Sequence, residues 1–557
     1  MDPSRARGKY DAMFDSHTGD GEYARRPGQR ERIWSALREH SSTANVVGVL
    51  VALCALLLLL LLPDTHHIDI RLPLYLIVVV WVLVRPRIAL YLLPFAIPWG
   101  SLDNPDGSFS THGYDADLLV GLLALSWLLG MTLRTFAVRE ERMFGPLDRE
   151  PWQPPRVLLV STLLLLASMV ISVKAAASVS TSLKEILKWL ELLILLLIGA
   201  PYIRTRRQLW TLAILIVLAA ISQACLGYVQ NFLALGPSSF VRDGSQRVYG
   251  TFNQPNPFAG YINIALTMTI ALTLLGHGVK VRYLAGLATL FLAGVEFFTL
   301  SKGGWIALGA AVLLITLVGI PRLRPVIGVC SFALLAVIGG FVLGILPMDW
   351  IEPTLIKLGF VDINFVRPND YNFANAERLA HWVAGLEMFH DHPLIGVGIG
   401  NYANAYPHYA QGVFTIPLGH AHNFYINMAA ETGILGLLTF LLFLTAIFLV
   451  GGRACRRLLQ RAQEGRAALA RSLPARSAAE QASNLQRLGI LVNDRALAIG
   501  LLAALVAVCV HNLVDNVYVH GMTALFALVI LLLIRLPETQ EQALQQTEQR
   551  LSTATFT

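Results

Sequence analysis

The amino-acid sequence predicts an all-α fold, a polytopic transmembrane helical bundle of 12–14 spans with one large extracytoplasmic loop that contains an amphipathic helix. Two features of the composition support this prediction. Of the 557 residues, 55% are hydrophobic and only 14% are charged, whereas a soluble protein carries roughly a quarter of its residues as charged side chains. Because so little charge cannot cover a water-facing surface, the composition excludes a soluble enzyme.

Apolar runs recur along the chain at lengths that approach the roughly 20 residues needed for one bilayer crossing. The first run ends in Pro63-Asp64-Thr65 without a small-residue cleavage site, which favours a retained span over a signal peptide. The second and third runs are short and can form one re-entrant unit. The candidate spans lie near residues 45–62, 72–84, 88–99, 117–133, 157–173, 183–201, 209–233, 256–276, 283–299, 304–320, 325–346, 423–450, 496–512 and 518–534.

The positions of the basic residues orient these spans. With the N-terminus in the cytoplasm, most of the 43 Lys and Arg residues fall on the cytoplasmic side, as the positive-inside rule requires. Both termini are therefore predicted to be cytoplasmic. The net charge of +7 does not indicate a nucleic-acid partner, because the basic residues lie in the loops and at the span ends, where they meet membrane lipids.

This orientation divides the chain into segments. They are a cytoplasmic basic tail (1–43), an N-terminal transmembrane region (44–246), a core (247–450) that includes the extracytoplasmic loop 347–421, a cytoplasmic basic helical loop (451–495), a C-terminal transmembrane pair (496–535) and a cytoplasmic tail (536–557). The loop 451–495 is expected to be a helix that rests on anionic lipid headgroups. The long outward loop is expected to carry function, because long loops in compact domains usually do.

The outward loop contains a predicted amphipathic helix over residues 375–390. Its apolar face comprises Leu379, Trp382, Val383, Leu386 and Phe389, and its polar face comprises Glu377, Arg378, His381 and Glu387. Pro393 ends this helix, and the glycines of "HPLIGVGIGNY" predict a tight turn that returns the chain to the membrane. A nucleotide-binding loop is disfavoured because the spacing is GxGxG rather than GxGxxG and no strand precedes it.

The segment "GHAHNFYINMAAETGILGLL" opens the next span with polar side chains. His420 and His422 lie at its outer boundary, and Asn423, Asn427 and Glu431 repeat every four residues along one helical face. Such a stripe must face protein or a cavity rather than lipid. It indicates either helix–helix hydrogen bonding or a histidine poised as a general base at a cavity mouth. A metal site is the weaker interpretation, because no carboxylate or third histidine has a compelling ligand spacing.

Two further outward stretches carry polar residues. In "RVYGTFNQPNPFAGYINIAL", Arg247 precedes a turn that includes Asn256, which predicts an ordered, ligand-facing loop. In "LSKGGWIAL", Lys302 can serve a ligand or simply extend to the headgroups. Ser301 has no general base beside it and is not predicted to be a nucleophile.

Charged residues inside the sixth span leave a second class of function open. Lys184, Lys188 and Glu191 share one helical face, and charges within a membrane suggest function. Lys188 and Glu191 can also form a structural ion pair. The alternative function is a multi-span solute transporter or permease, which predicts internal repeats and broken helices. No half-to-half repeat is visible, and most outward charges gather at the outer face instead.

Taken together, these segments resemble the bacterial O-antigen ligase and O-antigen polymerase superfamily of lipid-linked glycan transferases, over about residues 250–450. The most specific element is "DHPLIGVGIGNY" followed by "HAHN" and "ETGILG", and "GTFNQPNPFAGY" supports it. Family members commonly have Arg where this chain has Lys302. This difference keeps the charge but loses bidentate geometry.

The resemblance implies an inverting, metal-independent membrane glycosyltransferase of cell-envelope polysaccharide or lipopolysaccharide biosynthesis that needs no cofactor. Its donor would be an undecaprenyl-pyrophosphate-linked glycan, and its acceptor lipid A–core, another glycan or a protein hydroxyl. Its active site would face outward from the bacterial inner (cytoplasmic) membrane, and ligase and polymerase are not distinguished. The implied site comprises catalytic His422, donor-pyrophosphate-binding Arg247, Arg378 and Lys302, and supporting His420, Asn423, Asn256 and Glu431.

Overall fold

The computed structural model describes residues 51, 54–55, 68–100, 115–136, 152–242, 244–369, 372–471 and 478–554. The predicted tail 1–43, nearly all of the span 45–62 and most of the loop 134–156 lie outside the described residues, as do residues 555–557 of the C-terminal tail. The helices below belong to one compact unit, Ala52–Thr557.

The described part of the chain is almost entirely helical, which confirms the predicted all-α bundle. Nine described helices are long and apolar enough to cross a membrane, and three shorter apolar helices join them. One two-stranded hairpin, β1 (Val241–Arg242) and β2 (Ser245–Gln246), completes it. The helices are α2 (Ile68–Val84), α3 (Arg87–Trp99), α4 (Asp115–Phe136), α5 (Arg156–Ser172), α6 (Val179–Ile194), α7 (Arg206–Phe232), α8 (Pro255–Leu275), α9 (Val279–Phe298), α10 (Lys302–Gly319), α11 (Arg324–Val342), α12 (Glu352–Lys357), α13 (Phe373–Asp391), α14 (Tyr402–Ala405), α15 (Phe424–Arg471), α16 (Ala478–His511) and α17 (Met522–Ala554).

The core of the bundle forms around α8, α16 and α17. In the apolar, membrane-spanning parts of α8, α16 and α17, 78%, 83% and 89% of the residues are buried in the protein. The corresponding shares are 22% for α9 and 28% for α10. Small residues let these helices approach closely. A Cβ on Gly500 of α16 would lie only 2.8 Å from the Cα atom of Met268 in α8, so the two backbones are almost in contact, as is common between membrane helices.

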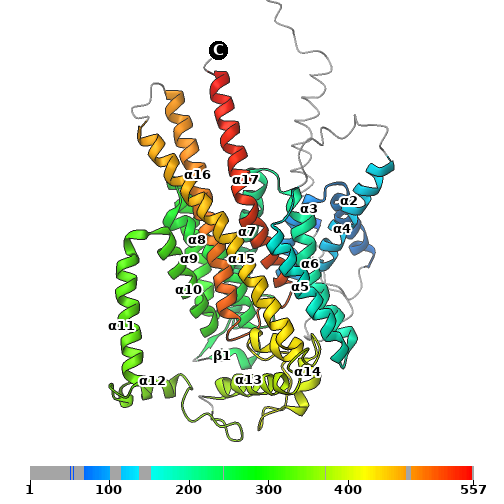
Figure 1. Ribbon diagram of the computed structural model, residues 1–557, viewed down its shortest axis with the longest axis vertical. Coiled ribbons are helices and arrows are strands. Elements are labelled where there is room, and N and C mark those ends of the chain that lie inside the picture. The colour runs from blue at the N-terminus through cyan, green and yellow to red at the C-terminus, as the bar shows by residue number, and fades with distance from the viewer. Residues whose placement is uncertain are drawn as a thin grey trace, which may run out of the picture. The chain divides into compact units, whose positions relative to one another are not determined.

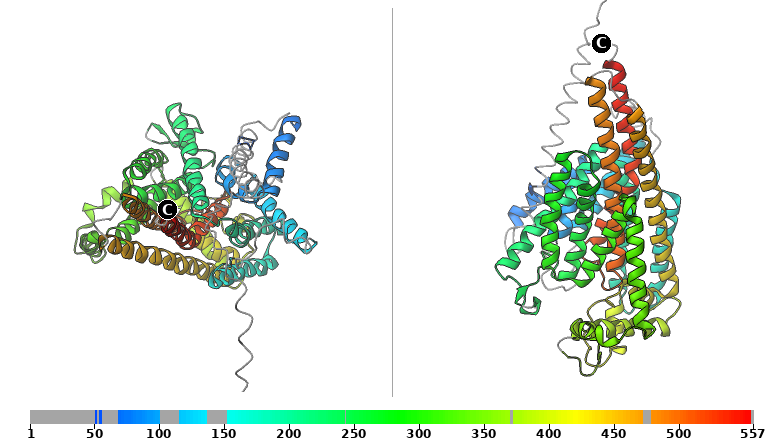
Figure 2. Two further views of the ribbon diagram at one scale, coloured as in Figure 1. Left: turned by 90° about the horizontal axis from the view of Figure 1, so that it is seen from above. Right: turned by 90° about the vertical axis from the view of Figure 1, so that its left-hand side faces the viewer.

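Helix α11 stands apart from the other helices and is joined to them at its two ends (Figures 1 and 2). Its apolar window is only 6% buried, and Phe332 and Val342 are 75% and 80% exposed. An apolar helix with so few protein neighbours is stable in a bilayer because its backbone hydrogen bonds are internal and its side chains face lipid.

The expectation for the loop 451–495 is only partly correct. Its described residues, 451–471 and 478–495, are helical, but they belong to α15 and α16 and form no separate helix. α15 has 48 residues, about 70 Å at 1.5 Å per residue, more than twice a hydrocarbon core of about 30 Å. Its second half is therefore expected to project beyond the apolar region, and in Figure 1 it extends with α16 and α17 past the shorter helices. There Arg461 pairs with Glu541 of α17 at 2.7 Å, and Arg487 of α16 pairs with Glu548 at 2.8 Å.

The helix predicted over residues 375–390 is confirmed as α13, but the face that packs inward is not the predicted apolar face. Leu386 from the predicted apolar face is 50% exposed, whereas His381 from the predicted polar face is 1% exposed. The buried residues are Ala376, Ala380, His381, Ala384, Gly385 and Met388. Small side chains on this face let α13 pack closely on the loop that follows it and on the start of α15, so the bulkier apolar residues are left outside.

The suggested ion pair within the sixth span is also different in the structure. Lys188 of α6 pairs with Glu185, with its Nζ 2.5 Å from Oε2. Glu191 is 5% exposed and hydrogen-bonds to Asp117 of α4. Lys188 pairs with Glu185 rather than with Glu191, because the buried Glu191 already has a partner on the neighbouring helix.

Candidate active site

The glycine turn of "HPLIGVGIGNY" lies along the backbone of α15. Gly396, Gly398 and Gly400 all have positive φ angles, of 66°, 97° and 74°, which is the conformation that glycine adopts without steric cost. Two backbone donors of this turn bond to α15, from Val397 to the Ala430 carbonyl and from Gly398 to the Glu431 carbonyl, both at 2.9 Å. The predicted tight turn is thus present.

Helix α15 is kinked where this turn meets it. Gly433 has a φ of 66° inside the helix, and its amide neighbour Ile434 donates to the Pro393 carbonyl at 2.8 Å. A Cβ at position 433 would collide with the carbonyl group of Leu394. The glycine of "ETGILG" and the proline of "HPLIG" therefore act together, and the kink holds α13 against the first turns of α15.

The predicted polar stripe of α15 is buried and satisfied by loops rather than by other helices. Glu431 Oε1 accepts from the Tyr402 amide at 3.0 Å, and Asn427 Oδ1 accepts from the Ala421 amide at 3.0 Å. Asn423 accepts from the amide of Tyr425, which caps the helix, and donates to the Leu513 carbonyl at 2.8 Å. Through these bonds, Glu431 and Asn427 hold the segment of chain that leads to His422.

The link from Asn423 to Leu513 brings a distant segment to the histidines. The Phe424 amide adds a second link, to the Asn512 carbonyl at 2.9 Å. Both anchor the short connection between α16 and α17 against the start of α15. Asp515 lies in this connection, and its side chain is 6% exposed.

Asp515 and His422 form a directly bonded pair. His422 Nδ1 lies 3.3 Å from Asp515 Oδ1, and His422 Nε2 is buried without a partner among the described residues. Burial alone would raise the pKa of Asp515, but the hydrogen bond from His422 and the charges of nearby imidazoles hold that pKa below its usual range. An ionised Asp515 requires Nδ1 to carry the proton. Nε2 is then the basic nitrogen.

His420 completes this cluster as the other neutral tautomer. Its Nδ1 accepts from the His422 amide at 3.0 Å, and its Nε2 faces Asp515 Oδ1 at 4.0 Å. Burial, together with the charge of His422, lowers the pKa of His420 to about 3. A neutral ring that accepts at Nδ1 carries its proton on Nε2. The Nε2–H group of His420 therefore faces the Asp515 carboxylate. His420 thereby holds the His422 backbone at its φ of 50°, a strained conformation for a non-glycine residue.

Two residues of the "RVYGTFNQPNPF" stretch reach the same carboxylate. Asn256 Nδ2 donates to Asp515 Oδ2 at 2.6 Å, and Arg247 Nη2 donates to Asn256 Oδ1 at 3.1 Å. Arg247 Nε also donates to the Thr299 carbonyl at 2.8 Å. Hydrogen bonds thus run from Arg247 through Asn256 and Asp515 to His422.

The other two predicted pyrophosphate ligands lie differently. Arg378 on α13 is close enough for its charge to contribute to the lowered pKa of His420, and its Nη1 bonds to the Ala374 carbonyl at 3.4 Å. Lys302 is exposed, and its Nζ lies 3.4 Å from the Leu358 carbonyl near the end of α12. The structure therefore brings Arg247 and Arg378 to the histidine cluster, whereas the Lys302 ammonium contacts the outward loop.

A third imidazole borders the site. The His381 ring lies 5.6 Å from the His422 ring and stacks on Tyr406 at 4.4 Å. Burial and the charge of His422 lower the pKa of His381 to about 4. Its neighbour Trp382 donates to the His422 carbonyl at 3.2 Å. Two consecutive residues of α13 thus contact His422.

The structure also bears on metal binding. Ligand atoms of His420, His422 and Asp515 lie within 4.8 Å of one another, close enough to hold a metal ion. The sequence argument against a metal relied on the lack of a well-spaced carboxylate, and that premise is wrong because Asp515 comes from a distant segment. The same atoms already exchange hydrogen bonds with one another and with Asn256. Metal independence therefore stays a prediction.

Sequence reasoning missed three residues of this site, namely His381, His511 and Asp515. Asp515 had a detectable signal, since it lies in a short connection, predicted to face outward, between the last two predicted spans, four residues after His511. His511 is 1% exposed, and both of its ring nitrogens are buried without a partner among the described residues. It lies against Gly303 of the "SKGGW" turn. His381 had no signal, because helical periodicity placed it on the polar face of the predicted helix.

A comparison with known protein families agrees with this geometry. A search of curated proteins found no match to the sequence. Residues 287–441, however, match the family model described as O-Antigen ligase. The matched segment contains Lys302, Arg378, His420 and His422, while Asp515 lies beyond it. The match confirms that this membrane bundle resembles the O-antigen ligase and polymerase superfamily over residues 287–441.

Proposed function

We propose that this protein transfers a glycan from an undecaprenyl-pyrophosphate carrier to an acceptor hydroxyl on the extracytoplasmic side of the membrane. The observation that best supports this proposal is the His422–Asp515 pair. Asp515 bonds to His422 Nδ1, and His422 Nε2 has no partner among the described residues. The family match supports a ligase- or polymerase-type enzyme. The donor, the inverting course and the roles of individual residues are part of the proposal.

In the proposed reaction, His422 Nε2 takes the proton of the acceptor hydroxyl as its oxygen attacks the anomeric carbon. The new glycosidic bond forms while the bond from that carbon to the pyrophosphate oxygen breaks, so the lipid pyrophosphate leaves from the opposite face. Asp515 stabilises the imidazolium that results, which is the role of an orienting carboxylate. Attack from the face opposite the leaving group inverts the anomeric centre.

The departing pyrophosphate gains negative charge, which guanidinium groups can stabilise by paired hydrogen bonds. Arg378 is the first candidate because its charge acts directly on the cluster. Arg247 bonds to Asn256, which in turn bonds to Asp515. Arg247 is therefore assigned two contacts, one with the donor pyrophosphate and one, through Asn256, with the Asp515 carboxylate. Lys302, which contacts the outward loop, is assigned a peripheral part in donor binding.

The polyprenyl tail of the donor needs an apolar environment next to this site. Helix α11 leads from the membrane directly into the outward loop that carries α13 (Figure 1). Its side chains face lipid rather than protein. A lipid-linked donor can therefore reach the loop from the bilayer beside α11 without crossing a packed interface.

The test is transfer by the purified full-length protein in detergent or nanodiscs. It is incubated in EDTA with an undecaprenyl-pyrophosphate glycan and separate candidate acceptors, and products are read by mass. We expect transfer in EDTA and none for His422→Ala, with normal protein level and membrane insertion. Product identity distinguishes a ligase from a polymerase. Solute movement across liposomes, with glycan transfer unaffected by His422→Ala, would instead favour the transporter.

A further inference from the structure

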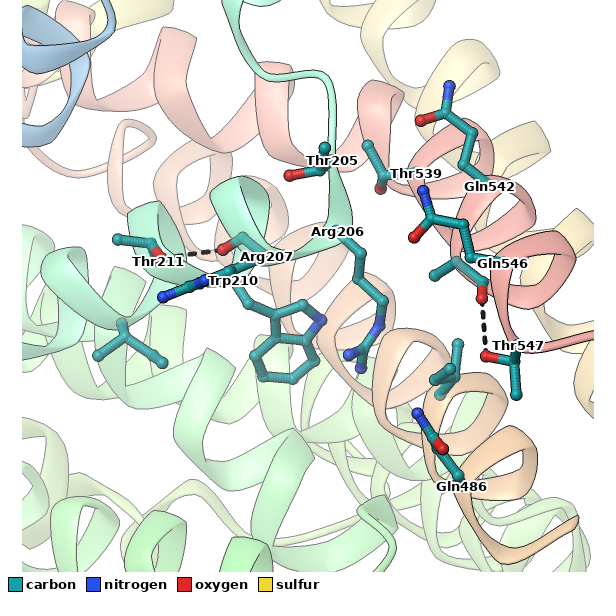
Figure 3. Close-up of a pocket in the computed structure, with 13 residues that line it drawn as sticks. Thr205, Arg206, Arg207, Trp210, Thr211, Gln486, Thr539, Gln542, Gln546 and Thr547 are labelled. Carbon is teal, nitrogen blue, oxygen red and sulfur yellow. Dashed lines mark hydrogen bonds between the residues drawn. The ribbon is translucent and has the colours of Figure 1, made fainter. Parts of the chain in front are cut away.

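A polar cavity lies at the end of α7 that is away from the histidines. It has a volume of about 440 Å³ and is lined by the start of α7 and by α16 and α17 (Figure 3). α7 has 27 residues, a length of about 40 Å. Its far end bonds through Asn231 to the Gln246 carbonyl, next to Arg247. The cavity and the candidate active site therefore lie at opposite ends of a membrane-spanning helix.

One cation of this cavity is held in place by a buried carboxylate. Arg206 Nε donates to both oxygens of Asp494, at 2.9 and 3.0 Å, and Trp210 Nε1 donates to Oδ1 at 2.7 Å. The Asp494 side chain is fully buried, whereas that of Arg206 is 26% exposed. Figure 3 shows the Arg206 side chain extending into the cavity. The guanidinium is thus pre-positioned, which lowers the entropy lost when it binds an anion.

The rest of the lining has an excess of positive charge and of hydrogen-bond donors. Arg207 is exposed, and no carboxylate is among the described residues that line the cavity with it. The amide side chains of Gln486, Gln542 and Gln546 approach from α16 and α17 (Figure 3). Guanidinium, amide and hydroxyl donors are the groups that bind phosphate oxygens. Asp494, the partner of Arg206, is buried and is not among the described residues that line the cavity.

The cavity lies where the helices change from apolar to polar. The last apolar residues of α17 precede Pro537, and Thr539 and Gln542 then line the cavity. Ile214 and Ile490 form its apolar wall on the side of the spans, and Trp210 lies beside them. Tryptophan at this level is typical of a membrane–water interface. A ligand with a phosphate and an attached apolar part fits a cavity that has polar donors on one side and these apolar side chains on the other.

We propose that this cavity binds a phosphate group, supplied by the headgroup of an anionic phospholipid of the membrane leaflet at this face. Basic pockets between membrane helices are a recurring site for such headgroups. The apolar wall of Ile214 and Ile490 favours a lipid over free phosphate. The bound headgroup would join α7, α16 and α17, and the last two helices carry Asp515 in the connection between them. The site does not depend on the proposed glycan transfer.

The test measures the unfolding temperature and native mass of the purified full-length protein. The probes are phosphatidylglycerol, cardiolipin, phosphatidylcholine and inorganic phosphate, each added separately. We expect anionic lipid to remain bound and to raise the unfolding temperature, and phosphatidylcholine to do neither. Arg207→Gln should weaken the apparent affinity for anionic lipid about tenfold, the effect of losing one charged hydrogen-bond donor. Gln546→Ala should weaken it less.

The matched control is Arg322→Gln, which removes an exposed arginine from the turn before α11, outside the cavity. It should bind anionic lipid as the wild type does. Arg206 is left intact, because its loss would strand the buried Asp494 and destabilise the fold. If inorganic phosphate raised the unfolding temperature as much as anionic lipid does, the phosphate site would be supported and assigned to a soluble ligand. Equal lipid binding by wild type and Arg207→Gln would overturn the proposal.

Discussion

His422 Nδ1 and Asp515 Oδ1 lie 3.3 Å apart although 93 residues separate them in the chain. The contact forms because Asn423 and the Phe424 amide tie the start of α15 to the connection between α16 and α17. Asp515 thereby selects the tautomer of His422. The pair has the arrangement of an orienting carboxylate and a general base, and it gives the proposed mechanism its most direct test.

Asp515→Asn should lower the rate of glycan transfer by on the order of 10²–10⁴-fold, with little change in the KM for donor. Asparagine fills the same space but can present its amide to His422 and favour the wrong tautomer. The assay is the initial rate on the lipid-linked donor. The double variant with His422→Ala should be no slower than His422→Ala alone, since residues that act as a unit are not additive. Additive losses would contradict the pairing.

Arg378→Ala and Arg247→Ala should impair donor use by roughly 100-fold each, in line with ~3 kcal/mol for one pre-positioned donor to a developing charge. Arg367→Ala is the control, because Arg367 is an exposed arginine of the same loop. The measurement is kcat/KM against donor concentration. If Arg367→Ala were as impaired as Arg378→Ala, a general loss of loop charge would explain the result better than contact with the pyrophosphate.

Gly433→Ala should destabilise the protein by more than about 2 kcal/mol, because its Cβ would meet the Leu394 carbonyl at a positive φ. The readout is the unfolding temperature in detergent, with the yield of inserted protein. Gly309→Ala in α10 has open space around its Cβ position and should be neutral or slightly stabilising. A neutral Gly433→Ala would show that the kink does not hold α13 in place.

Stability should fall as the pH is lowered from about 6.5 to about 4, and His381 should account for part of the loss. Its pKa in the folded protein is about 4, below the value of about 6.5 in an unfolded chain. In this window the unfolded state binds more protons, so acid favours unfolding. His381→Gln should show a shallower decline in unfolding temperature between pH 7 and pH 4. An unchanged slope would assign the acid sensitivity to other groups.

The sequence by itself determined the class of the fold and the ends of most spans, because apolar runs and their flanking charges depend on local composition. It also predicted the glycine turn and singled out His422 as the candidate catalytic residue, since both appear within short contiguous motifs. It could not show that His381 is buried, because small alanines rather than the larger apolar residues of α13 pack inward. Nor could it show that the loop 451–495 continues two membrane helices.

Only the tertiary structure decided which groups surround His422. His422, Asp515 and the stretch that holds Arg247 and Asn256 come from three separate parts of the chain, and the hydrogen bonds between them depend on how α8, α15 and α16 pack. Sequence spacing carries no information about such contacts, because the helices that bring them together are fixed by burial of apolar surface far from the polar groups themselves. For the same reason, the cavity lined by Arg206 and Arg207, at the end of α7 away from His422, could be found only in the tertiary structure.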